Sequence, residues 1–116
     1  MEISQRLDIL LESGVITKEV YYKLIRTVDE LKAKHGIEIN EENGGMFITH
    51  LSAAITRMDK GEPIESLDEI IIEQVKQDKN YGEAMKIMKT LNSVIDIEFP
   101  LEEETFIVTH LCSILN

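Results

Sequence analysis

The sequence predicts an all-α fold, a compact bundle of five or six helices. Apolar residues recur at helical spacing along most of the chain, only residues 37–39 and 97–99 look extended, and no Gly/Ser-rich or Pro-rich linker interrupts the sequence. A chain of 116 residues with 43% hydrophobic content is long enough to build one core. We therefore expect a single domain over residues 1–116.

Two helices are predicted in the first third of the chain. Apolar residues near the N-terminus share one helical face, and Gly14 can end this helix in the left-handed conformation. Thr17 can cap a longer helix that ends at Gly36. The residues that follow, 37–45, contain a Glu-Glu-Asn-Gly-Gly run without helical periodicity, and we expect them to form a connection.

The middle of the chain predicts a third and a fourth helix. An apolar stripe runs from Phe47 to Met58, and Gly61 can end that helix. Ser66 followed by Glu69 has the spacing of a capping box, which predicts the start of the fourth helix.

The last third of the chain predicts a fifth and a sixth helix. A stripe from Tyr81 to Ile95 predicts a helix that ends near Asp96. Pro100 suits the first turn of the final helix, and the acidic residues 102–104 favour this end because they complement the helix dipole. We expect the final helix to run to the C-terminus.

The chain is strongly acidic. It carries 12 Lys and Arg against 22 Asp and Glu, a formal net charge of -10 at pH 7. This charge repels nucleic acid phosphates and anionic lipids. We therefore expect neither direct nucleic-acid binding nor membrane binding.

Targeting signals and cysteine clusters are lacking in the sequence. The N-terminal segment has no basic stretch followed by an apolar run, and no segment approaches the roughly 20 apolar residues of a membrane span. Cys112 is the only cysteine, so the chain can form neither an intramolecular disulfide nor a cysteine cluster for metal. We expect a buried thiol and a cytoplasmic location.

His50 and His110 are the candidate functional residues. We expect His50 at the edge of the apolar stripe of the third helix, with Arg57 about two turns further along the same face. His110 lies within the stripe of the last helix, and Glu103 precedes it by about two turns. The local sequences also match, because Ile-Thr-His-Leu-Ser around His50 parallels Val-Thr-His-Leu-Cys around His110.

Other interpretations of these histidines are weaker. Either one taken singly could be a hydrogen-bonded core residue. Metal binding by His50, His110 and Glu103 is conceivable, but no short-range ligand spacing supports it. The sequence contains no Gly-rich phosphate loop, His-Glu-x-x-His pair or recognisable Ser or Cys nucleophile motif. We therefore expect neither an enzyme nor a metal or cofactor site.

Two motifs surround the histidines. The first consists of His50, Leu51, Ala53, Ala54, Ile55, Arg57 and Gly61. The second consists of Pro100, Glu102, Glu103, Phe106, Ile107, His110 and Leu111. In order and spacing they resemble the two histidine motifs of the PTS regulation domain, or PRD. The resemblance covers roughly residue 44 to the C-terminus, and Tyr81 and Ala84 fit the break between the family's intervening helices.

The resemblance implies a regulatory domain of the bacterial sugar phosphotransferase system, phosphorylated on histidine by HPr or a sugar-specific IIB component. The family usually responds by a change of dimer state, so we expect a homodimer that regulates transcription or a partner protein. PRDs usually accompany an RNA-binding antiterminator or a DNA-binding activator domain, and this chain shows neither. The alternative is an interaction or scaffold module whose histidines are structural.

The two motifs differ at one position beside a histidine. The family usually has an acidic residue before the first histidine, where this chain has Thr49. A carboxylate there can orient the imidazole, whereas Thr49 replaces it only in part. The resemblance therefore implies that His110 is the better phosphoryl acceptor and His50 the slower one, with Arg57 and Glu103 as supporting residues.

Overall fold

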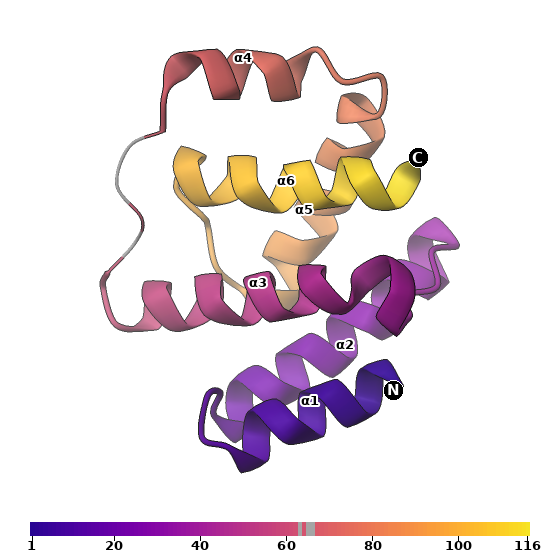
Figure 1. Ribbon diagram of the computed structural model, residues 1–116, viewed down its shortest axis with the longest axis vertical. Helices are drawn as coiled ribbons and strands as arrows, with labels where there is room; N and C mark the ends of the chain where they lie inside the picture. Colours follow the sequence, from indigo (N-terminus) through magenta and orange to yellow (C-terminus); the bar gives the residue numbers. More distant parts are fainter. Residues whose placement is uncertain (63, 65–66) are drawn as a thin grey trace.

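The chain folds into helices. The computed structural model describes residues 1–62, 64 and 67–116, and within these ranges there are six α-helices and no strand (Figure 1). Their bounds are α1 (Ile3–Glu12), α2 (Lys18–His35), α3 (Glu41–Asp59), α4 (Glu69–Lys76), α5 (Tyr81–Ile95) and α6 (Leu101–Leu115). The predicted all-α bundle is confirmed.

Several helix ends follow the predicted local signals. The Thr17 hydroxyl accepts a hydrogen bond of 3.2 Å from the Val20 amide and so caps α2. Gly36 ends α2 in the left-handed conformation, with a φ of 66°. Asp96 adopts the same conformation after α5, which is unusual for a residue that has a side chain.

α3 begins earlier than the sequence suggested. Asn40 is its N-cap, and the amides of Asn40 and Asn43 each donate to the side chain of the other, at 2.8 and 2.9 Å. The prediction of a connection over residues 37–45 was therefore wrong for residues 41–45, which are helical.

Two glycines explain this error. Gly44 and Gly45 are typical of loops, yet both are buried within α3. A Cβ atom at Gly44 would lie 2.5 Å from Cγ2 of Ile39, and one at Gly45 would lie 3.0 Å from the Glu41 carboxylate. The glycines thus allow the preceding segment and the Glu41 side chain to pack closely on α3, and they do not end the helix.

α4 lies at the surface and packs on α6 (Figure 1). Its N-cap is Asp68, whose carboxylate accepts a hydrogen bond of 3.0 Å from the Ile70 amide. The capping box predicted at Ser66 involves a residue outside the described ranges. None of the residues of α4 is buried.

α3 and α6 position the candidate site. They lie side by side and run in opposite directions, and α5 packs against α6 on the interior side (Figure 1). Leu51 of α3 and Leu111 of α6 are each 1% exposed, as their apolar stripes predicted. The thiol of Cys112 is also buried, as predicted. Across the part of the chain that the structure describes, no helix has the length and apolar character needed to cross a membrane.

Candidate functional site

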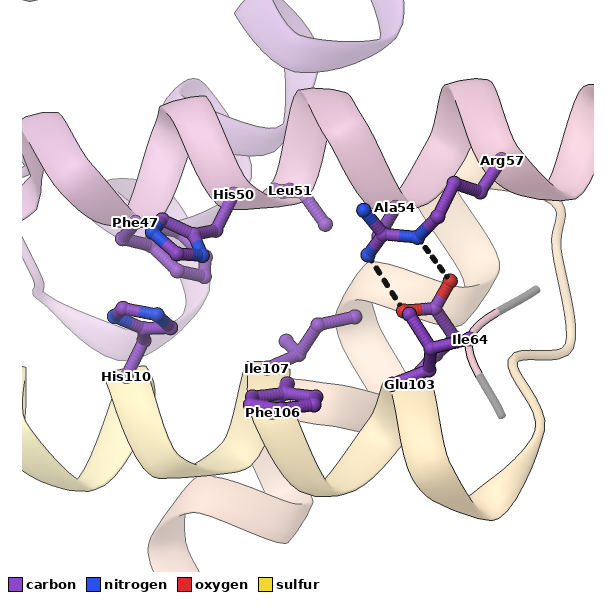
Figure 2. A pocket seen from close by; sticks show the side chains of 10 residues that line it. All are labelled: Phe47, His50, Leu51, Ala54, Arg57, Ile64, Glu103, Phe106, Ile107 and His110. Atoms are coloured by element: carbon purple, nitrogen blue, oxygen red, sulfur yellow. Dashed lines mark hydrogen bonds and ion pairs between the residues drawn. The ribbon is translucent and has the colours of Figure 1, made fainter. Parts of the chain in front are cut away.

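The two candidate histidines lie opposite each other, one on α3 and one on α6 (Figure 2). Their ring centroids are 4.6 Å apart and the ring planes are tilted by 46°, which is contact distance for two rings. The side chain of His50 is exposed and that of His110 is half-buried. Residues that are 60 positions apart in the sequence therefore form one accessible pair.

The two supporting residues form a second pair between the same helices (Figure 2). Nε and Nη2 of Arg57 donate to the two carboxylate oxygens of Glu103, at 3.0 and 2.7 Å. The Glu103 side chain is fully buried, whereas that of Arg57 is 35% exposed. This bidentate geometry is the strong form of an ion pair.

The sequence placed Arg57 near His50 and Glu103 near His110, but did not anticipate the ion pair between them. A signal was present, because each partner lies about two turns from the histidine on its own helix. If two helices run antiparallel and the histidines face each other, then a residue two turns after one histidine faces a residue two turns before the other. The relative direction of α3 and α6 is needed to predict this pairing, and the sequence alone did not supply it.

A cleft of about 210 Å³ connects the two pairs. Apolar side chains line it between the histidines and the ion pair: Phe47, Leu51, Ala54, Ile64, Phe106 and Ile107. The site therefore combines an apolar centre, two imidazoles at one end and a guanidinium at the other (Figure 2).

The electrostatic environment favours a neutral His110. Its pKa is lowered below the ordinary histidine value, chiefly by burial and further by the neighbouring His50 ring. In the described residues, no hydrogen bond occupies a ring nitrogen of either histidine. A neutral imidazole with an unengaged nitrogen is a competent nucleophile.

Thr49 makes its hydrogen bonds away from the histidine pair. Its hydroxyl accepts a hydrogen bond of 2.7 Å from Nη1 of Arg6 and donates one of 3.1 Å to the carbonyl of Gly45. Arg6 also forms an ion pair with Glu41. The Thr49 hydroxyl is therefore engaged by α1 and by its own helix. The sequence analysis missed Arg6 and Glu41, which are too distant in the chain to show a local pattern.

The third histidine lies outside this cleft. Nε2 of His35, the last residue of α2, is 2.8 Å from the hydroxyl of Thr90 on α5. His35 is therefore a matched control for the candidate pair. Within residues 1–62, 64 and 67–116, no group of three or more His, Cys, Asp or Glu side chains could hold a metal ion.

The chain is similar to known proteins over most of its length. Residues 17–114 match the family model of the PRD domain. The chain is also 27% identical over 106 residues to a protein of Escherichia coli (strain K12), Uncharacterized protein YhfY, and this match covers 91% of the chain and 88% of the relative. No solved structure matches the chain significantly.

Proposed function

The chain belongs to the PRD domain family of phosphotransferase-system regulatory domains, and from this premise we propose that it is phosphorylated on His110 and His50 by HPr or a IIB component. In this proposal the protein is a non-enzymatic, cytoplasmic homodimer without a bound cofactor or metal. Phosphorylation changes its association and thereby regulates transcription or a partner protein.

The facing histidine rings carry the proposal. Two imidazoles with unengaged nitrogens meet at an accessible cleft, where a donor protein can reach them. A structural histidine is usually satisfied by an internal hydrogen bond, as His35 is by Thr90. The described residues provide no such partner to His50 or His110.

The chemistry requires only the imidazole and the donor. The lone pair of a neutral ring nitrogen attacks the phosphorus of a phosphohistidine or phosphocysteine on the donor, and the donor's phosphorus–nitrogen or phosphorus–sulfur bond breaks. The donor side chain leaves with the electron pair and takes up one proton, while the acceptor ring gives one up. The product adds about −1.5 to −2 charges to the cleft.

This added charge supplies a means of signalling. A phosphoryl group near Arg57 gains charge-assisted hydrogen bonds, whereas the buried carboxylate of Glu103 repels it. Phosphorylation therefore competes with Glu103 for the same guanidinium. Because that ion pair joins α3 to α6, its weakening would alter the surface around the cleft.

The test is reconstitution of the purified protein with phosphoenolpyruvate, enzyme I and HPr, or with a IIB component, followed by mapping of phosphohistidine under alkaline conditions. We expect labelling that is lost when both candidates are replaced, in His50→Gln with His110→Gln. The matched control His35→Gln should be labelled like the wild type. Absence of labelling by every donor would favour the scaffold alternative, in which oligomeric state is independent of phosphorylation.

We predict that His110 is the better acceptor of the two. Thr49 stands where an acidic residue would orient His50, and its hydroxyl is occupied by Arg6 and Gly45. The nucleophilic nitrogen of His50 is therefore less well defined. His110→Ala should reduce the rate of labelling more than His50→Ala does, in variants shown to fold normally. The opposite order would reverse the assignment.

A further inference from the structure

We infer that His50 and His110 form a single phosphoryl site that holds one group in total, so that a phosphoryl group on either ring excludes a second. The inference rests on the proposed function and deepens it. It concerns the number of phosphoryl groups that the cleft can hold at one time, which neither the family match nor the sequence pattern addresses.

The two rings are too close to carry separate phosphoryl groups without strong repulsion. With ring centroids 4.6 Å apart, two phosphoryl groups would be held on neighbouring side chains in one cleft. The helices cannot move apart at low cost, because Leu51 and Leu111 follow the two histidines directly and are both buried. Two dianions would therefore remain close together.

The cleft also offers little positive charge. Arg57 is the one cationic side chain among the described residues that line the cleft, and its Nε and Nη2 are already engaged by Glu103. Its Nη1 makes no hydrogen bond to the described residues, so the guanidinium can meet one phosphoryl group, in competition with Glu103 for the same positive charge. A second dianion would face the first, and also Glu103, in a chain of net charge -10.

Two phosphoryl groups here would resemble two carboxylates that share a site. When two acidic groups lie that close, ionisation of one strongly disfavours ionisation of the other. A phosphoryl group carries more charge than a carboxylate, so the effect is larger. If two different donors phosphorylate this protein, they therefore compete for the same site, and one molecule cannot carry a phosphoryl group from each.

Phosphoramidate tests this without a protein donor. Its phosphorus–nitrogen bond breaks as the bond to the ring nitrogen forms, and the departing ammonia takes up the proton that the ring gives up. In a His35→Gln background, we expect intact mass spectrometry to show one added phosphoryl group and no second. The two variants that additionally carry His50→Gln or His110→Gln should each accept one group as well.

These outcomes separate the two proposals. Two groups on the His35→Gln chain would overturn the single site but support the proposed function. Acceptance by only one of the two variants would also overturn the shared site, because one ring alone would then be the acceptor. Absence of any addition would contradict the proposed function itself. Circular dichroism of each variant confirms that it is folded before labelling.

A charge substitution at Met46 tests the cause. This residue is 61% exposed and lies one turn before His50, on the same side of α3. In the His35→Gln background, Met46→Arg should admit a second phosphoryl group, because it supplies the missing positive charge. The matched control Met46→Gln should still stop at one. Equal uptake by these two variants would show that charge does not limit the site.

Discussion

An arginine–glutamate ion pair attaches each end of α3 to another part of the molecule, but the two pairs differ in how far they are buried. At its N-terminal end, Arg6 of α1 pairs with Glu41 and bonds to Thr49. At its C-terminal end, Arg57 pairs with Glu103 of α6. Glu41 is 27% exposed, whereas Glu103 is fully buried. A partly exposed pair contributes less to stability than a buried one, because a fully buried carboxylate depends on its partner.

Because the two ion pairs differ in burial, the two ends of α3 have different roles. The Arg6 pair positions α1 on α3 and occupies Thr49, at the side away from the histidine contact. The Arg57 pair keeps a negative charge inside the bundle beside the cleft, where a phosphoryl group would compete for the guanidinium. One end is thus a partly exposed attachment, and we propose that the other couples the charge state of the cleft to helix packing.

The largest expected effect comes from the apolar contact beneath the histidines. Leu51→Ala and Leu111→Ala should each lower the free energy of unfolding by about 2–5 kcal/mol, because each side chain is almost fully buried. Chemical denaturation measures the loss. The exposed Glu73→Ala is the control and should change the value by less than about 0.5 kcal/mol. Equal losses in all three variants would contradict the core assignment.

Arg57→Ala should have the next largest effect. It leaves the Glu103 carboxylate buried without its partner, and we expect a loss of about 2–3 kcal/mol, below the range for fully buried pairs because Arg57 is partly exposed. Urea denaturation of the double variant Arg57→Ala with Glu103→Gln provides the comparison. The double variant should recover part of the lost free energy of unfolding, because no buried charge remains at position 103. A double variant less stable than Arg57→Ala would show that the buried charge is not the cause.

Arg6→Ala should destabilise the protein less than Arg57→Ala does. Both members of its ion pair are about one quarter exposed, so water replaces the lost contacts. The midpoint of thermal unfolding of the two variants, measured side by side, tests the order. A greater loss for Arg6→Ala would mean that the α1 attachment, and not the α6 attachment, holds α3 in place.

Two groups around α3, His110 and Glu41, should also respond to acid in different pH ranges. Burial and the His50 ring lower the pKa of His110, so the folded chain binds this proton less tightly than the unfolded chain does. Stability from this group is complete above the unfolded histidine value of about 6.5 and is lost as the pH falls below it. Denaturation at about pH 7.5 and about pH 5.5 should therefore show a smaller loss in His110→Gln than in the wild type.

Glu41, at the N-terminal end of α3, provides the contrast. The hydrogen bonds and charge of Arg6 lower the pKa of Glu41, so the stability from this group is present above the ordinary glutamate range and is lost only as the pH falls through the lowered value. Glu41→Gln should therefore leave the stability difference between about pH 7.5 and about pH 5.5 unchanged. It should reduce the loss of stability at more acidic pH. An unchanged histidine-range loss in His110→Gln would exclude His110 as its source.

Local features of the fold could be read from the sequence because they depend on residues within a few positions of one another. Thr17 caps α2 and Gly36 ends it, as predicted, and the apolar stripes correctly placed Leu51 and Leu111 in the core. The prediction was wrong where one residue type is compatible with two local structures, as glycine is with a loop and with a closely packed helix. Gly44 looked like part of a loop, but it serves a close approach of Ile39 to a helix.

The candidate site divides in the same way. Sequence periodicity and the family resemblance identified His50, His110, Arg57 and Glu103 one helix at a time. That the two histidines touch, and that Arg57 binds Glu103, follows from the antiparallel register of α3 and α6. This register is set by many weak packing contacts across the whole core, of which those of Leu51 and Leu111 are only a part. Helix faces are therefore a property of short segments, whereas the pairing of these faces required the complete fold.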